Sequence, residues 1–495
     1  METVLAVGHT MGALLYALGA VLLVPLAVGL IAGEPHRPLL VGFGSTALGS
    51  VVLGFLLRLG PKPRPLAEVR AMLVCGLAWI VLSAIGAVPL WLLVSTSYLD
   101  AVFEMVSGFT TTGITMYAGL EEMPASVMFW RNWTQWFGGL GILTMYMVLT
   151  GQPAHVLAGA EAHKIAAARP RPGLANTLRV LWTVYLGLSV FVLLGLLLGG
   201  VGPFEAMNHA FTTVSTGGFS TRDESIAFYR RDGYSPAVIE WVVILGMLGG
   251  GTSFLVHYQT LKGSPSAWWR SSEARVWLLL LAGFLGLLIV EQAVTGSGMF
   301  ATDGLTVAGF EHGIRTNLFQ VLAILTTTGY ATQDIASPYY GAAAHLLFLA
   351  MMLIGGCVGS TSGGIKVLRI VLLAKVFGRV VAGIVAPRGA IDEVVLDGRI
   401  VPSSEVRRVA GLFFVWLALM GVGGLVTALA THHDALASVS GMFSALNNIG
   451  PCYIPTPAMA ELPAVVKVVY MLGMLAGRLE ILPIALLFSP SAWRE

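Results

Sequence analysis

The sequence predicts an all-α membrane protein in which four pseudo-symmetric span–re-entrant pore helix–span repeats surround one pore, with two additional N-terminal spans. Hydrophobic residues make up 56% of the 495 residues and charged residues only 11%, whereas a soluble domain has about 25% charged residues. The mean hydropathy of +0.81 agrees with this. Long apolar stretches recur along the chain, and four shorter ones each end in a polar cluster that contains glycine.

Ten stretches are predicted to span the membrane, because a helix needs about 20 apolar residues to cross the hydrocarbon core. Two of them, 9–32 and 38–57, precede the repeated part of the chain. The others are 71–95, 128–150, 176–200, 236–260, 275–295, 342–375, 406–430 and 463–488. Four shorter apolar segments are predicted to be re-entrant half-helices, at 100–112, 204–216, 312–328 and 434–447.

The basic residues indicate how the chain is oriented in the membrane. Of the 28 Lys and Arg residues, 20 lie in alternate connections that share one side with both termini, and 7 lie in the opposite set. Basic residues accumulate in cytoplasmic loops. We therefore expect both termini in the cytoplasm of a bacterium, a multi-pass protein of the inner membrane, and half-helices that enter from outside. The net charge of +2 gives no sign of a nucleic-acid partner.

The polar clusters are related to one another and define a fourfold repeat. The strings Phe109–Thr115, Val214–Ser220, Leu325–Ala331 and Leu446–Cys452 align on one glycine each, at Gly113, Gly218, Gly329 and Gly450. We expect the following organisation: N-terminal spans in 1–66, repeats in 67–155, 170–265, 272–380 and 405–495, and a cytoplasmic linker in 381–404.

These clusters have the chemistry of a cation filter. Rings of backbone carbonyls replace the hydration shell of an ion, glycine permits the backbone angles that this requires, and threonine hydroxyls add ligands. The candidate K⁺ ligands are Thr111, Thr112, Gly113, Thr216, Gly217, Gly218, Thr327, Thr328, Gly329, Asn448, Ile449 and Gly450. Acidic residues nearby, such as Glu104, Glu205, Glu311 and Asp434, are interpreted as helix caps or vestibule charges.

Two further features are candidates for a gate. Glycines interrupt the predicted span 342–375, and unwound backbone at membrane depth is tolerated mainly where it is buried in protein or lines water. A charge such as Arg478 inside a span is costly, so we expect it to face the pore and to contact this loop near Ser360 to Ser362. A packing kink is the alternative for the loop, and a structural pairing with Glu480 or with backbone carbonyls is the alternative for Arg478, although residues two positions apart do not share a helix face. The candidate gate residues are Gly355, Gly356, Gly359, Gly363, Gly364 and Arg478.

Over nearly its whole length the chain resembles the TrkH/KtrB/HKT superfamily of potassium transporters, and within it the TrkH type. Four strings carry the resemblance together with the repeated clusters: Ser107–Thr115, Asn447–Pro451, Gly355–Lys366 and Gly477–Glu480. In this family a glycine in the first filter accompanies potassium selectivity, as at Gly113, and serine there admits sodium. The fourth cluster departs from the Thr-Gly pattern.

The resemblance implies a homodimer in membrane lipid, with one pore in each protomer, and a cytosolic TrkA-type regulatory subunit that binds nucleotides of the NAD or ATP class. The chain itself has no Walker A string and no Gly-x-Gly-x-x-Gly after a strand, so we expect no enzyme and no bound cofactor, with K⁺ as the transported ion. The stretch 376–405 is the most polar cytoplasmic segment, and it is either the dock for the partner or an ordinary solvated loop.

Potassium uptake through a channel-like pore is the first functional hypothesis. An H⁺- or Na⁺-coupled potassium symporter is the alternative, and a scaffold without transport would leave the repeats unexplained. Coupled transport usually needs an ionisable residue along the path, and the predicted filter contains none. Passive conduction is therefore favoured.

Overall fold

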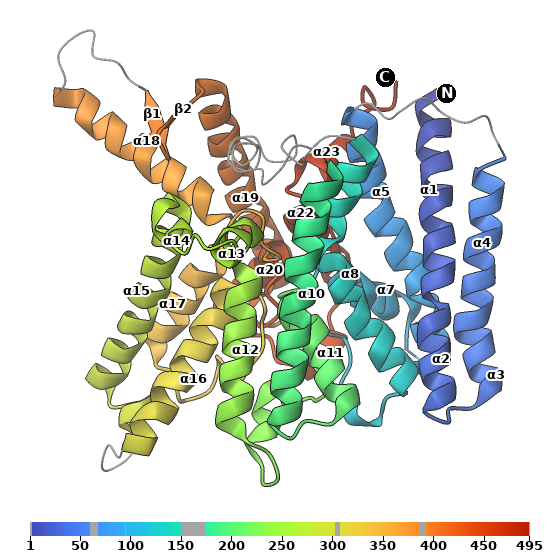
Figure 1. Ribbon diagram of the computed structural model, residues 1–495, viewed down its shortest axis with the longest axis horizontal. Helices are drawn as coiled ribbons and strands as arrows, with labels where there is room; N and C mark the ends of the chain where they lie inside the picture. Colours follow the sequence, from blue (N-terminus) through green and yellow to red (C-terminus); the bar gives the residue numbers. More distant parts are fainter. Residues whose placement is uncertain are drawn as a thin grey trace.

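Long helices stand side by side in the computed structural model, with both chain ends at the same end of the molecule (Figure 1). The structure describes residues 2–59, 68–94, 96–150, 174–301, 307–385 and 393–494. Within these ranges the fold is almost entirely helical, as predicted. Six helical segments there are long and apolar enough to cross a membrane, namely Thr3–Ile31, His36–Leu57, Val69–Val94, Asn176–Leu198, Ser272–Thr295 and Ser403–Ala430.

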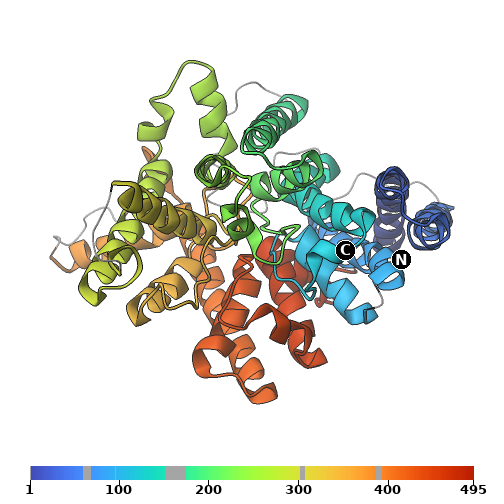
Figure 2. The same ribbon diagram turned by 90° about the horizontal axis from the view of Figure 1, so that it is seen from below.

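The two N-terminal spans form an antiparallel pair at one edge of the molecule (Figure 2). The first consists of α1 (Glu2–Val21) and α2 (Leu23–Ile31), and the second of α3 (His36–Leu39), a π-helical turn (Leu40–Gly44) and α4 (Ser45–Leu57). A Cβ added to Gly12 would lie 2.7 Å from the Gly54 carbonyl oxygen, and one added to Gly54 would lie 2.8 Å from the Gly12 carbonyl oxygen. The backbones of α1 and α4 are therefore in direct contact, as glycines allow between membrane helices.

Each repeat consists of two long elements and a helix that ends at a glycine cluster. Repeat 1 contains α5 (Glu68–Gly86), α6 (Val88–Val94), α7 (Tyr98–Phe109) and α8 (Ala125–Thr150). Repeat 2 contains α10 (Leu174–Leu198), α11 (Pro203–Val214), α12 (Pro236–Gly251), α13 (Phe254–Leu261) and α14 (Ala267–Arg270). Repeat 3 contains α15 (Ser272–Thr295), α16 (Val307–Leu325), α17 (Ala342–Met352) and α18 (Val367–Val385). Repeat 4 contains α19 (Ser403–Ala430), α20 (Ala435–Asn447), α21 (Thr456–Ala460), α22 (Ala464–Arg478) and α23 (Leu482–Leu487).

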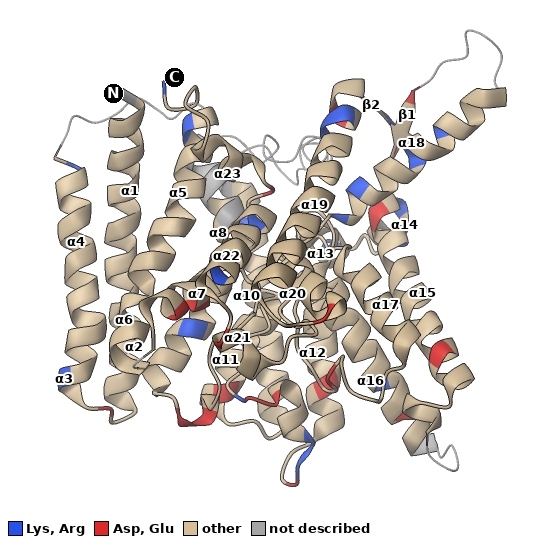
Figure 3. Ribbon diagram, turned by 180° about the vertical axis from the view of Figure 1, so that it is seen from behind, with Lys and Arg blue, Asp and Glu red and all other residues tan. Residues whose placement is uncertain are grey.

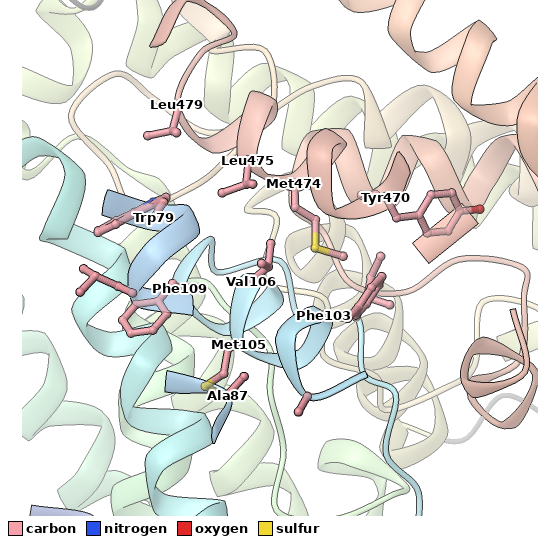
Figure 4. Packing of buried hydrophobic residues seen from close by; sticks show 14 of the residues in the cluster. Trp79, Ala87, Phe103, Met105, Val106, Phe109, Tyr470, Met474, Leu475 and Leu479 are labelled. Carbon is pink, nitrogen blue, oxygen red and sulfur yellow. The ribbon is translucent and has the colours of Figure 1, made fainter. Parts of the chain in front are cut away.

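The four repeats close into a ring through one kind of helix contact. The helix that follows each glycine cluster packs against the cluster-bearing helix of the next repeat: α8 on α11, α12 on α16, α17 on α20 and α22 on α7. Figure 2 shows the repeats in chain order around a common centre. Repeats 4 and 1 share the core drawn in Figure 4, where Met474 and Leu475 of α22 lie near Val106 of α7.

Three of the predicted spans are not continuous helices. The expected span 236–260 breaks at Thr252, and its two halves, α12 and α13, are bent by 105°. The span 342–375 is interrupted between α17 and α18, and the span 463–488 is interrupted between α22 and α23, where Glu480 and Ile481 have positive φ. Hydropathy could not show the breaks in 236–260 and 463–488, because apolar residues continue on both sides of each, whereas the glycines of 355–364 predicted the interruption of 342–375. α16 has 19 residues and is longer than a half-helix would need to be.

A small hairpin lies within the predicted linker 381–404 and is an exception to the all-α prediction. Strands β1 (Val394–Leu396) and β2 (Arg399–Val401) pair antiparallel. Arg379 of α18 donates to the Glu393 carbonyl oxygen at 2.7 Å, and Lys375 donates to that of Val395 at 2.8 Å. The hairpin is therefore attached to α18, which itself extends to Val385, past the predicted repeat boundary at 380.

Residues 386–392 lie outside the described residues, as do 60–67 and 151–173, where other predicted boundaries fall.

Charged residues are distributed unequally between the two ends of the molecule. Figure 3 shows Lys and Arg gathered mainly at the end that carries both termini, and Asp and Glu mainly toward the opposite end. The cluster-bearing helices begin on the acidic side, as Figure 1 shows for α11 and α16. The predicted grouping of the basic residues on one side of the chain is thus present in three dimensions.

The contact between α1 and α4 predicts a test of stability. Changing Gly54 to Leu should lower the free energy of unfolding by about 1–3 kcal/mol, the usual cost of overpacking, because the added side chain would meet the Gly12 carbonyl. Gly49 lies on the same helix with open space around its Cα, so Gly49→Leu is the matched control. Thermal unfolding of both variants in detergent measures the difference, and equal melting temperatures would contradict the contact.

Candidate selectivity filter and gate

The four predicted clusters share one unusual backbone conformation. We call the segments Thr111–Gly113, Thr216–Gly218, Thr327–Gly329 and Asn448–Gly450 the glycine turns. Their first residues have φ of 54°, 51°, 56° and 55°, and their glycines have φ of 84°, 78°, 82° and 107°. Positive φ is a genuine outlier for a β-branched residue such as threonine. Its recurrence at equivalent positions of three repeats, with asparagine in the fourth, points to a functional requirement rather than to chance.

The glycine turns meet at the centre of the molecule in a closed ring. A Cβ added to Gly113 would collide with the Gly217 carbonyl oxygen, one on Gly218 with that of Thr328, and one on Gly329 with that of Ile449. A Cβ on Gly450 would lie 3.1 Å from the Thr112 carbonyl oxygen. Each glycine therefore packs against the carbonyl of the residue that precedes the next repeat's glycine. All twelve predicted filter residues belong to this ring, the three of each turn in order: Thr111, Thr112, Gly113, Thr216, Gly217, Gly218, Thr327, Thr328, Gly329, Asn448, Ile449 and Gly450.

The departure of the fourth turn from the Thr-Gly pattern has a structural role. The Asn448 side-chain amide donates to the Thr112 hydroxyl at 2.9 Å and to the Met474 carbonyl oxygen at 2.9 Å. Asparagine tolerates the left-handed conformation more readily than most residues. At this position it therefore adopts the common backbone and also ties turn 4 to turn 1.

A buried ion pair behind the first two turns was not foreseen from the sequence. The Arg131 Nε lies 2.5 Å from the Glu104 carboxylate, and both side chains are fully buried. Glu104 also accepts hydrogen bonds from the Thr115 hydroxyl at 2.9 Å and the Met116 N–H at 2.8 Å. Arg131 donates to the Ser220 carbonyl oxygen at 3.0 Å. The pair thus joins the segments that follow turns 1 and 2. The interpretation of Glu104 as a cap or vestibule charge was wrong; an acid and an arginine in neighbouring apolar segments were the available signal.

The other charges near the turns take ordinary positions. Asp434 is a helix cap, as expected, and its carboxylate accepts from the Ala437 N–H at 2.7 Å. Glu205 pairs with Arg222, and Glu311 pairs with Arg315. Among the described residues no group of three His, Cys, Asp or Glu side chains is placed to hold a metal ion.

The interruption between α17 and α18 is an ordered loop, 353–366, that docks beneath turns 2 and 3. The Gly363 N–H donates to the Thr327 hydroxyl at 2.7 Å, and the Ser362 hydroxyl donates to the Thr326 carbonyl oxygen at 2.7 Å. The Thr361 hydroxyl donates to the Val214 carbonyl oxygen at 2.9 Å. This dense hydrogen bonding satisfies unwound backbone where water is scarce, so the loop is held in place rather than free.

The glycines of the loop allow close backbone contacts. A Cβ added to Gly355 would collide with the Gly363 carbonyl, and one added to Gly363 would lie 2.7 Å from the Asn447 carbonyl oxygen. Gly356 packs equally closely on the Gly251 carbonyl. Gly359 and Gly364 have φ of 72° and 66°. The loop therefore reaches turn 4 as well as turns 2 and 3, a crossing that side chains at these positions would prevent.

Arg478 is the last residue of α22 and lies beside this loop. Its guanidinium donates to the Thr361 carbonyl oxygen at 2.5 Å, and to those of Gly138 and Gly139 on α8 at 2.8 and 2.9 Å. The expected contact with the loop is thus present. The side chain is only 7% exposed. It places a positive charge between the loop and repeat 1.

Glu480 does not pair with Arg478, in agreement with the helical spacing of the two residues. It accepts from Arg369 of α18 at 2.5 Å. This ion pair connects α18, the helix that follows the loop, to the bend that follows Arg478. Movement of α18 would therefore be transmitted to both the loop and the end of α22, a connection that hydropathy could not indicate.

Comparison with known proteins identifies the family of the chain. The family model described as "TrkH: Cation transport protein" matches residues 59–494. The Trk system potassium uptake protein TrkH of Halomonas elongata is 32% identical over 98% of each chain, and that of Escherichia coli is 30% identical over 99% of each. The crystal structure of the potassium transporter TrkH from Vibrio parahaemolyticus superposes with a TM-score of 0.84 at 26% identity, over 100% of this chain and 99% of that one. The chain therefore belongs to the TrkH family of cation transport proteins.

Proposed function

We propose that this protein takes up K⁺ across the bacterial inner membrane through a selectivity filter formed by the four glycine turns. The single observation that carries the proposal is the closed ring of backbone carbonyls at Thr112, Gly217, Thr328 and Ile449. The similar proteins from Halomonas elongata and Escherichia coli are named potassium uptake proteins. As a cation transport protein by family, the chain is not an enzyme.

The chemistry of the ring suits a dehydrated cation. Carbonyl dipoles arranged around an axis replace the waters of the ion. α7, α11 and α20 also end at their turns, so the partly negative C-terminal ends of these helices point toward the ring and favour positive charge. The Thr111 hydroxyl and the Asn448 side-chain oxygen are buried without a hydrogen-bond partner among the described residues, which leaves both free to contact an ion.

We propose further that the loop 353–366 and Arg478 form the gate of this pore. The loop crosses beneath three of the four turns, on the side of the turns that faces away from the acidic end of the molecule. Its Gly363 N–H donates to the Thr327 hydroxyl. The charge of Arg478 next to the loop would repel a cation that leaves the filter. In this arrangement the loop and the arginine close the pore together, because each is hydrogen-bonded to the other.

The proposal includes an orientation of the protein in the membrane and the partners that it binds. The end with both termini carries most of the Lys and Arg residues (Figure 3), and by the positive-inside rule it faces the cytoplasm. α18 and its hairpin project from that end (Figure 1) and form the natural dock for a cytosolic TrkA-type subunit that binds NAD- or ATP-class nucleotides. Since Arg369 links α18 to Glu480, such a subunit would act on the gate by moving α18. A homodimer in membrane lipid, with one pore in each protomer, completes the proposal.

The alternative is a potassium symporter coupled to H⁺ or Na⁺. Such a protein needs an ionisable group that changes state along the path. Glu104 is the buried acid hydrogen-bonded to the segment that follows turn 1, but its carboxylate is engaged by Arg131 and by two further donors. This carboxylate is engaged in holding the segments that follow turns 1 and 2, and the twelve filter residues contain no ionisable side chain. Passive conduction is therefore the better-supported mechanism.

Flux into liposomes separates these two mechanisms. Purified protein reconstituted with a potassium gradient alone should give K⁺ flux that follows the gradient and the membrane potential. Imposed pH or sodium gradients should not change the direction of this flux at a fixed potential. Flux that appears only with a pH or sodium gradient would establish the symporter instead.

Substitution of Gly113 should change the selectivity of the pore. A serine there must accommodate a φ of 84° and meets the Gly217 carbonyl oxygen, so Gly113→Ser should admit Na⁺ and lower the K⁺:Na⁺ permeability ratio. Gly119 has a similar φ of 72° with open space around it, which makes Gly119→Ser a control for backbone strain alone. Reversal potentials of the two variants in planar bilayers provide the measurement. A ratio that stays unchanged in Gly113→Ser would remove this residue from the filter.

The gate predicts an increase in flux when it is weakened. Arg478→Ala, and separately deletion of residues 358–362, should each raise basal K⁺ flux in the absence of a regulatory subunit. Arg478→Gln retains an amide donor but no charge, so it shows how much of the closure is electrostatic. Arg231→Ala, which alters an exposed arginine paired with Glu224, is the control. Wild-type flux in both gate variants, with the protein correctly folded, would exclude both elements as the gate.

A further inference from the structure

Gln135 makes one hydrogen bond to the glycine turn of repeat 2 and one to the residue that follows this turn. The residue lies on α8 of repeat 1, and its side chain is fully buried. Its amide nitrogen donates to the Gly217 carbonyl oxygen at 2.7 Å, and its amide oxygen accepts from the Phe219 N–H at 3.0 Å. The side chain therefore spans Gly218 and holds the peptide groups on both of its sides.

Comparison of the repeats shows that packing alone does not require a polar residue at this position. Gly138 of α8 packs on the carbonyl of Phe109, and Phe109 lies four residues before Gly113, the glycine of turn 1. Gly250 of α12 and Gly477 of α22 make the same contact with the carbonyls of Val214 and Leu446, so these three glycines are equivalent. The residues three positions before them are Gln135, Met247 and Met474. Methionine has a similar length but no amide to donate.

The turn that Gln135 contacts is also the one whose middle residue has no side chain. The middle residue of a glycine turn is Thr112, Thr328 or Ile449 in repeats 1, 3 and 4, but it is Gly217 in repeat 2. Two consecutive glycines can rotate their shared peptide plane at little steric cost. A Cβ added to Gly217 would collide with the Gln135 amide group. The amide therefore occupies the space that a side chain on residue 217 would need.

We infer that Gln135 is a positioning residue that fixes the Gly217 carbonyl in the ring and thereby helps to set ion selectivity. The inference rests on the proposed filter. A carbonyl oxygen has two lone pairs, and the amide N–H engages one of them, which fixes the rotation of the peptide and leaves the other for an ion. Selectivity depends on the number and field strength of the carbonyls that face the ion. A peptide at Gly217 that is free to rotate would weaken one quarter of the ring.

The test compares permeability ratios among variants of the full-length protein in planar bilayers. Gln135→Met introduces the residue found in repeats 2 and 4. It should retain K⁺ conduction while the K⁺:Na⁺ permeability ratio falls about fivefold, the factor that one hydrogen bond of ordinary net strength controls. Met247→Leu alters the equivalent position of α12 and should leave the ratio at the wild-type value.

A double variant distinguishes positioning from a general loss of structure. In Gln135→Ala the amide is removed and space opens beside residue 217. Adding Gly217→Thr then gives turn 2 the middle residue of turns 1 and 3, whose side chain restricts the peptide in place of the amide. Gln135→Ala alone should lose selectivity, and the double variant should regain most of it. A merely structural role would lower the melting temperature and the flux of K⁺ and Na⁺ together, without changing their ratio.

The possible outcomes are distinguishable. Wild-type protein that conducts K⁺ selectively, together with Gln135→Met and Gln135→Ala variants that keep the wild-type ratio, would overturn the role of Gln135 and leave the filter intact. Wild-type protein without K⁺-selective conduction would overturn the proposed function and this inference with it. If Gln135→Met does not fold, Gln135→Leu provides the same test, because leucine is of similar size and cannot donate to the Gly217 carbonyl.

Discussion

The close approach of four backbone segments at the centre of the molecule is the constraint on which the rest of the structure depends. Each turn glycine lies so near the carbonyl of the next repeat that a Cβ at Gly113, Gly218 or Gly329 would collide with it. Four backbone segments of one chain can converge in this way only if the helices that carry them are held in a ring. The contacts of α8, α12, α17 and α22 with the neighbouring repeats supply that ring. The long helices thus serve mainly to position a few peptide groups.

The polar groups that this convergence buries are satisfied by neighbours from the same repeat and from adjacent repeats. The Glu104–Arg131 pair serves the segments after turns 1 and 2, Asn448 connects turns 4 and 1, and the loop 353–366 provides donors to turns 2 and 3. An unpaired polar group at this depth would cost about 1–3 kcal/mol. Some of these bonds cross between repeats, as from Asn448 to Thr112, and others lie within one repeat, as from Ser362 to Thr326. Displacement of the loop must leave several of its partners to water or to an ion.

The four repeats are alike in backbone and unlike in chemistry, and the differences indicate where function resides. Gly138 of α8, Gly250 of α12 and Gly477 of α22 pack on the carbonyls of equivalent residues. The next residue is a glycine in α8 and α12, but it is Arg478 in α22. Turn 2 has Gly217 where the other turns carry a side chain. The fold therefore uses fourfold pseudo-symmetry to build the ring, and single substitutions within it to regulate what passes.

The amino-acid sequence by itself determined the helical membrane fold, the four glycine turns and the contact of Arg478 with the glycine-rich loop, because apolar length, glycine at a repeated spacing and an isolated buried charge each have one economical physical solution. Only the tertiary structure decided where the spans break, as at Thr252 and Glu480, and which distant groups meet, as in Glu104 with Arg131, Glu480 with Arg369 and Gln135 with Gly217. Pairings of this kind join residues 27 to 111 positions apart along the chain, and no local pattern shows whether such a partner satisfies a freed backbone group or a buried charge.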